Sequence, residues 1–129
     1  PAESDSVARI CRHADHPQIR SLVGQKPSIG LSKACVKRAR VMVTTDSGPR
    51  HFAAAFNVPT VTIFGPTDPR WSHNYLNRSI DLQLDVDCGP CARRVCPLVH
   101  HRCMRDLSVE QVIAATSSLL DVLEREQAA

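Results

Sequence analysis

The chain of 129 residues has few aromatic side chains: three Phe, one Trp and one Tyr. Its core must therefore consist of aliphatic side chains and alanine. Binding of single-stranded nucleic acid is disfavoured, because it relies on aromatic rings interleaved with basic residues. The formal net charge of +3 is too small to indicate a polyanionic partner. No apolar run is long enough to span a bilayer, and internal repeats and low-complexity segments are absent. The length fits one domain with a core of useful size.

Short β-branched runs alternate with helical patterns along the chain, which predicts an α/β fold. In such a fold a Rossmann-like parallel sheet carries helices on its faces. Strands are expected at residues 41–45, 60–64 and 82–86, the last as an edge strand because apolar and polar residues alternate there. A further short strand is expected from Ile19 to Val23. A single domain over residues 1–129 accounts for this order.

Helices are expected at residues 4–14, 31–39 and 49–56, and from Ser108 to near Glu124. Ser4 or Ser6 is expected to cap the first helix, and a capping box of Ser108 and Gln111 the last. Asn57 is expected to end the third helix in a left-handed conformation. The apolar stripe of the last helix is predicted from its spacing. Its members are Val109, Val112, Ile113, Thr116, Leu119, Leu120 and Leu123.

A polar turn between the strand at 41–45 and the helix at 49–56 is the strongest candidate site. It contains Asp46, Ser47, Gly48 and Pro49, and His51 lies one turn into the helix. Ligands of open α/β sheets bind beyond the carboxyl ends of strands, and Gly48 allows close backbone approach. We therefore predict that these five residues bind a phosphate-bearing ligand. The alternative is that Asp46 and Ser47 only cap the helix and His51 packs against it.

The loop over residues 65–77 follows the next strand at the same sheet edge. Pro66 and Pro69 are expected to make a rigid turn in which Asp68 forms a local hydrogen bond. Thr67 and Asp68 are expected to face the cleft at this edge. Arg70 is either a group that steers an anionic substrate or a solvated charge.

Six cysteines are present, and in the absence of secretory features they are interpreted as reduced thiols of a cytoplasmic protein. Cys11 and Cys35 are expected in the core. The other four have the spacing C-x2-C-x4-C-x6-C and lie near His100 and His101; they are Cys88, Cys91, Cys96 and Cys103. They could hold zinc, or they could be thiols packed in a compact loop.

No acidic residue occurs between positions 88 and 105, a segment that contains four arginines: Arg93, Arg94, Arg102 and Arg105. This basic segment could face lipopolysaccharide or the anionic lipid of a membrane, or it could be an ordinary solvated loop.

Several motifs together resemble the ADP-heptose:lipopolysaccharide heptosyltransferase family. They are Asp46-Ser47-Gly48-Pro49 with His51, Ala53-Ala54-Ala55, Val58-Pro59, Phe64-Gly65-Pro66-Thr67-Asp68-Pro69, Cys88-Gly89-Pro90-Cys91, Cys96-Pro97-Leu98 and His101-Arg102-Cys103-Met104-Arg105-Asp106. The similarity is clear from about Leu22 onward.

The resemblance implies an enzyme of the GT-B type, in which two Rossmann-like domains face a cleft. The C-terminal domain binds ADP-heptose, and the N-terminal domain binds the lipopolysaccharide acceptor and supplies the catalytic carboxylate. The chain resembles only part of the C-terminal domain, so it is expected to be a fragment that binds the donor without catalysing transfer. No metal or cofactor is implied, and neither is nucleic acid. The expected location is the cytoplasm, with peripheral contact at the inner membrane.

Two other functions are compatible with the same residues. One is a glycosyltransferase of the same architecture that uses another nucleotide sugar. The other is a non-catalytic zinc-binding module that contacts a partner.

Overall fold

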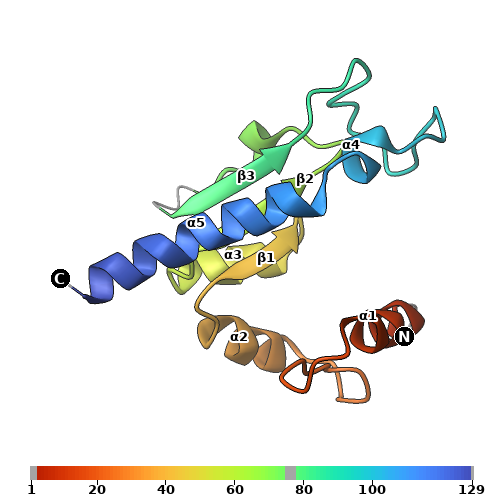
Figure 1. Cartoon of the computed structure of the whole chain (residues 1–129). Helices are drawn as coiled ribbons and strands as arrows, with labels where there is room; N and C mark the ends of the chain where they lie inside the picture. The colour runs from red at the N-terminus through yellow and green to blue at the C-terminus, as the bar shows by residue number, and fades with distance from the viewer. Residues whose placement is uncertain (1–2, 75–77, 129) are drawn as a thin grey trace.

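The computed structural model describes residues 3–74 and 78–128, which form a three-stranded sheet with helices on both faces (Figure 1). The elements follow in the order α1 (Ser4–Ala14), α2 (Ile29–Lys37), β1 (Met42–Thr45), α3 (Pro49–Ala55), β2 (Thr60–Phe64), the 3₁₀ helix η1 (Pro69–Ser72), β3 (Ser79–Gln83), α4 (Arg102–Arg105) and α5 (Val109–Gln127). The predicted α/β class is confirmed.

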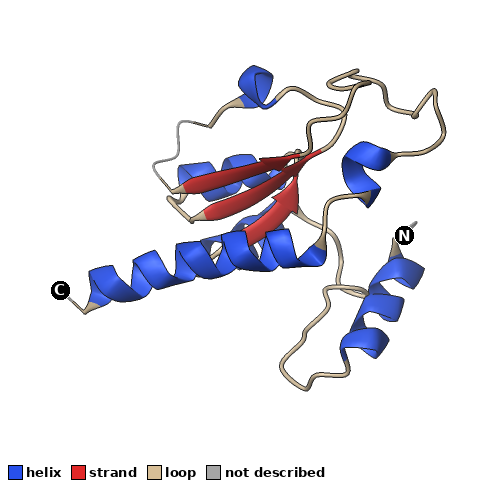
Figure 2. Cartoon of the chain, turned by 45° about the horizontal axis from the view of Figure 1, so that its top comes forward, coloured by secondary structure: helices blue, strands red, loops and turns tan. Residues whose placement is uncertain are grey.

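The sheet has the order β1-β2-β3, and both pairings are parallel. Thr44 of β1 stands opposite Thr62, which in turn stands opposite Asp81 of β3. The carboxyl ends of all three strands therefore reach the same edge (Figure 2). The central strand β2 has the bounds that its β-branched run predicts, and Val61 in it is fully buried.

Two small apolar clusters hold the helices to the sheet. On one side Val36 of α2 packs with Ala53 of α3 and with Val58. On the other side Ala115 and Leu119 of α5 pack on Val61. The buried members of both clusters are Val, Leu and Ala, but Phe52 and Phe56 pack against the first cluster, so the expectation of an aliphatic core holds only in part. The two clusters place α3 and α5 on opposite faces of β2 (Figure 2).

Four expectations about the elements are wrong. No strand forms from Ile19 to Val23, where the chain turns and its apolar side chains are exposed. The third strand lies at 79–83 instead of 82–86, because its register is set by pairing with β2. The N-cap of α1 is Glu3, with no side-chain cap bond, and α5 continues to Gln127.

The helix α2 also begins and ends two residues before the expected 31–39, because the Ser28 side chain caps it. Two other helix signals are confirmed. Asn57 adopts the expected left-handed conformation after α3, with φ of 54°. Ser108 and Gln111 form the expected reciprocal capping box at the start of α5. Residues 75–77 of the expected loop lie outside the described residues.

Buried positions differ from two further expectations. In α5 the buried residues are Ala115 and Leu119, whereas Val109 and Ile113 of the predicted stripe are exposed. Cys35 is also exposed, because α2 turns the adjacent Val36 toward the core instead. Within the described residues, no helix is long and apolar enough to cross a membrane.

Candidate functional site

The candidate site lies at the carboxyl edge of the sheet, where the loops after β1 and β2 meet. Asp46 is the residue that joins them. Its Oδ2 accepts a hydrogen bond from the Thr67 hydroxyl at 2.9 Å, and its Oδ1 accepts one from the Ser72 hydroxyl at 3.2 Å. Both donors come from the segment after β2, so the expectation that Thr67 faces this edge is supported by its contact. The Asp46 carboxylate fixes the two loops relative to each other.

Arg50 supports the same carboxylate from inside the protein. Its Nε lies 3.2 Å from Asp46 Oδ1, one helical turn away along the chain. The guanidinium also donates a hydrogen bond to the Ser72 carbonyl and lies over the Phe64 ring, 5.1 Å from the ring centre. The residue is only 2% exposed, and its Nε makes the ion pair without a hydrogen bond. A buried guanidinium therefore holds β2, η1 and the turn after β1 together.

Sequence reasoning did not single out Arg50. The available signal was the spacing of four residues between Asp46 and Arg50, which places opposite charges on adjacent helical turns. That spacing is common on exposed helix surfaces, where such pairs contribute little. This pair is buried because α3 packs against β2. The spacing alone does not predict that packing.

The remaining predicted residues surround the joined loops. The Ser47 and Thr44 hydroxyl oxygens are 3.2 Å apart. Gly48 is the N-cap of α3, with an ordinary φ of −49°, and no atom lies within 4 Å of where a Cβ would stand. The space beside the Gly48 backbone is therefore open. The exposed His51 ring has its Nδ1 2.8 Å from Asn74 Oδ1.

The alternative in which Asp46 and Ser47 cap α3 is wrong, because the helix has no side-chain cap bond. This turn also has fewer free backbone N–H groups than a helix N-terminus usually offers to a ligand. Pro49 has no N–H, whereas the amides of Arg50 and His51 donate back to the Ser47 and Gly48 carbonyls at 3.2 and 3.1 Å. The amides of Ser47 and Gly48 are thus the ones at this turn that could meet a ligand.

The loop after β2 is a rigid turn, as expected for its two prolines. The Asp68 side chain accepts a hydrogen bond from the Arg70 amide at 2.9 Å and caps η1, whose first residue is Pro69. The Arg70 guanidinium is 2.5 Å from the other Asp68 oxygen. Hydrogen bonding from the Arg70 side chain lowers the pKa of Asp68. Arg70 is therefore paired with Asp68, but its side chain is 87% exposed, as a solvated charge would be.

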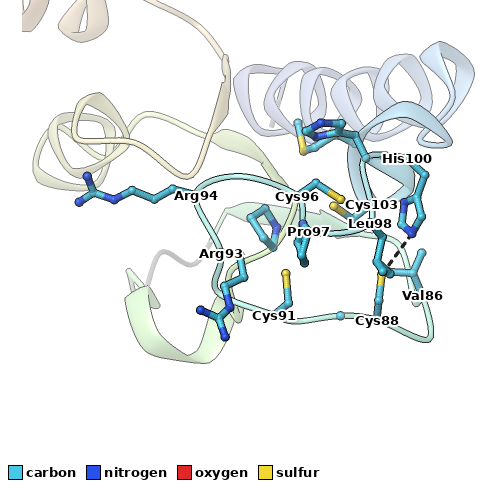
Figure 3. A pocket seen from close by; sticks show the side chains of 14 residues that line it. Val86, Cys88, Cys91, Arg93, Arg94, Cys96, Pro97, Leu98, His100 and Cys103 are labelled. Carbon is cyan, nitrogen blue, oxygen red and sulfur yellow. Dashed lines mark hydrogen bonds between the residues drawn. The ribbon is translucent and has the colours of Figure 1, made fainter.

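The second cluster of polar side chains is the cysteine-rich loop between β3 and α5. Cys88, Cys91, Cys96 and Cys103 line one cavity of about 210 Å³ together with His100 (Figure 3). The contact drawn there joins Cys88 Sγ to His100 Nε2 at 3.9 Å.

The thiols in this loop are not equivalent. Backbone hydrogen bonding from His101 lowers the pKa of Cys96, whereas burial raises that of Cys103. Among the described residues, no three His, Cys, Asp or Glu side chains are arranged to hold a metal ion.

Comparison with known proteins decides the family. Residues 1–101 match the family described as "Glycosyltransferase family 9 (heptosyltransferase)". The chain belongs to glycosyltransferase family 9. The match covers most of the chain, including the joined loops and the first three cysteines of the cysteine-rich loop, which the sequence motifs had indicated.

The names of curated relatives agree with the description of this family. A "Lipooligosaccharide heptosyltransferase 2" of Campylobacter jejuni subsp. jejuni serotype O:2 is 44% identical over 81 residues, which are 62% of this chain and 25% of the relative. A "Lipopolysaccharide heptosyltransferase 1" of Pseudomonas aeruginosa is 38% identical over 121 residues, which are 89% of this chain and 32% of the relative. A "Lipopolysaccharide heptosyltransferase 2" of Escherichia coli K12 is 24% identical over 101 residues.

This family 9 chain spans only a quarter to a third of the length of the first two relatives. No solved structure gives a significant match. The activity of a whole heptosyltransferase is therefore a matter of proposal for this chain.

Proposed function

We propose that the chain is the donor-binding part of a heptosyltransferase that moves heptose from ADP-heptose to the lipopolysaccharide inner core. The supporting observation is the pair of loops joined through Asp46, next to open space at Gly48. A ligand at this edge would meet the Ser47 and Gly48 amides, the Ser47 hydroxyl and the exposed His51 ring. The two amides and the hydroxyl are donors for a diphosphate.

In the proposed reaction an acceptor hydroxyl of the inner core attacks the anomeric carbon of heptose. The bond from that carbon to the diphosphate oxygen breaks, ADP leaves, and a carboxylate base takes the proton of the hydroxyl. The donors at the turn stabilise the charge that develops on ADP. Family resemblance assigns the base to an N-terminal domain. We infer that the enzyme works in the cytoplasm, at the inner face of the membrane where its lipid acceptor lies.

Titration with ADP, followed by nitrogen–proton NMR, tests the site. We expect the largest shifts at the amides of Asp46, Ser47, Gly48, Arg50 and His51. Shifts confined to residues 88–105 would contradict the proposal.

A glycine substitution at the turn gives a sharper test. Gly48→Val should abolish ADP binding, because its side chain would fill the open space beside the backbone, and the fold should persist because φ is ordinary. Gly30→Val is the matched control, since its Cβ would meet only the Ser28 hydroxyl at 3.9 Å. Equal binding by both variants would place the nucleotide elsewhere.

If an N-terminal domain supplies the base and binds the acceptor, the 129-residue chain by itself should transfer no heptose. Transfer needs donor and acceptor held in a productive geometry, which a single domain does not supply. Activity should appear when an N-terminal domain of the family is joined in one chain. Transfer by the 129-residue chain, abolished by Asp46→Asn, would show instead that the base is Asp46.

A donor panel on that joined enzyme separates ADP-heptose from other nucleotide sugars. Elemental analysis tests the remaining alternative, because a zinc-binding module would carry stoichiometric zinc and lose its fold on chelation.

A further inference from the structure

The segment over residues 92–105, named here the arginine loop, has an unusual surface. Three apolar side chains in it are well exposed: Val95 at 77%, Leu98 at 56% and Val99 at 74%. Met104 of α4 is exposed as well. Exposed apolar side chains are ordinary when scattered, but here they are gathered in one short loop. A partner that accepts apolar groups would remove them from water.

The arginines of the arginine loop differ in whether a carboxylate already pairs with them. Arg102 lies 2.9 Å from the Asp106 carboxylate, and its pKa is raised by that hydrogen bond. Arg93, Arg94 and Arg105 make no ion pair with any described residue, and all three are exposed. Figure 3 shows the Arg93 and Arg94 side chains extending away from the sulfur atoms of the cavity. Three cations are therefore available to a partner.

The arginine loop is held in place beside the candidate site. The Ala92 amide donates to the Pro66 carbonyl at 2.7 Å, and so ties the start of the loop to the turn after β2. On the other side Met104 packs against Gly65, where an added Cβ would lie 2.6 Å from the Met104 sulfur. The exposed side chains are thus carried on a braced segment at the carboxyl edge of the sheet.

We propose that the arginine loop docks on the surface of an anionic phospholipid bilayer. Cations and neighbouring apolar side chains on one loop match the two layers of a membrane interface, with charged headgroups outside and acyl chains beneath. An acidic protein could also satisfy the arginines, but the lipid acceptor of the proposed function lies in a bilayer, which favours the membrane as the partner. The proposal names the contact surface of the peripheral membrane association inferred above. It does not depend on which nucleotide sugar is bound.

Co-sedimentation with vesicles tests the docking. We expect the chain to bind vesicles of phosphatidylcholine mixed with phosphatidylglycerol, and not vesicles of pure phosphatidylcholine. Each arginine near such a surface contributes a factor of about five to binding, so replacing all three by glutamine should weaken binding about a hundredfold. The variant is Arg93→Gln, Arg94→Gln, Arg105→Gln.

A second triple variant with the same change in net charge serves as control. It replaces exposed arginines of α1 and the end of α2: Arg9→Gln, Arg12→Gln, Arg38→Gln. It should keep most of the binding. Equal losses in both variants would show attraction by net charge alone and overturn the assignment to the loop.

Insertion of the apolar side chains is measured separately. Leu98→Trp in a Trp71→Phe background should give a blue-shifted emission that brominated acyl chains quench, only with the anionic vesicles. Val95→Ser with Leu98→Ser should weaken binding while leaving the melting temperature nearly unchanged, because both side chains are exposed. An unchanged Leu98→Trp emission, or no binding of the chain to anionic vesicles, would overturn the proposal and leave a protein partner as the explanation of the surface.

Discussion

Replacement of Arg50 by methionine tests whether the buried ion pair stabilises the joined loops. Methionine has a similar length and keeps contact with the Phe64 ring, so the change removes mainly the charge and its hydrogen bond to Ser72. Removing one partner of a fully buried ion pair costs about 3–5 kcal/mol, because the other charge stays buried without compensation.

The expected cost here is at the low end of that range. The Asp46 side chain is 23% exposed, and it keeps its bonds to Thr67 and Ser72 after the change. Water can therefore replace part of the lost attraction. We expect Arg50→Met to lower the free energy of unfolding by about 3 kcal/mol.

Urea denaturation measures this change through the shift of the midpoint at unchanged slope. Arg125→Met is the control, since within the described residues that exposed arginine makes a local bond to the Asp121 carbonyl of α5, and its replacement should change stability by less than about 0.5 kcal/mol. A loss below about 1 kcal/mol for Arg50→Met would refute the reasoning. It would mean that the buried guanidinium costs nearly as much to desolvate as its contacts return.

Two further changes test other parts of the site. Gly65→Ala would place a Cβ 2.6 Å from the Met104 sulfur, so the flexible and partly exposed Met104 side chain must shift, and the free energy of unfolding should fall by about 0.5–1 kcal/mol in urea denaturation. Asp68→Asn should reduce the loss of stability in acid. Because hydrogen bonding from Arg70 lowers the pKa of Asp68 in the folded state, its contribution is present above the unfolded pKa and disappears as pH falls through the folded one. Melting temperatures at about pH 6 and below about pH 3 measure the difference.

Matched variants sharpen both tests. Gly48→Ala has open space for its Cβ, and should leave the chain as stable or slightly more stable. Asp85→Asn removes an exposed carboxylate outside the turn. If Gly65→Ala behaves like Gly48→Ala, the contact with Met104 is not a tight one. If Asp85→Asn changes the acid sensitivity as much as Asp68→Asn does, the Arg70 pair is not its source.

The sequence predicts the elements that depend on local chemistry. The bounds of β2 follow from its β-branched run, the start of α5 from Ser108 and Gln111, and the end of α3 from Asn57. Residues 19–23 have the composition of a strand, but no strand in the described part of the chain lies beside them to pair with. Composition alone does not reveal whether a partner strand is present. The same limit applies to β3, whose bounds follow its hydrogen bonds to β2.

The residues of the candidate site also fall into two groups: those that the local sequence predicts and those whose roles depend on tertiary packing. Asp46, Ser47 and Gly48 are visible in the sequence because a polar turn follows a buried strand. Thr67 could be placed at the same edge by the same argument. The roles of Arg50 and Ser72 depend on how closely η1 packs against α3, and this becomes apparent only in three dimensions.

The attachment of α1 has a consequence for how the chain opens in solution. No residue of α1 is buried, and the helix is joined to the sheet through the exposed turns of residues 15–28. Its amide hydrogens should exchange with solvent through local opening, whereas those of β2 should exchange only when the whole domain unfolds. Brief proteolysis should therefore cut within residues 15–28 first, and the remainder should keep its cooperative melting transition.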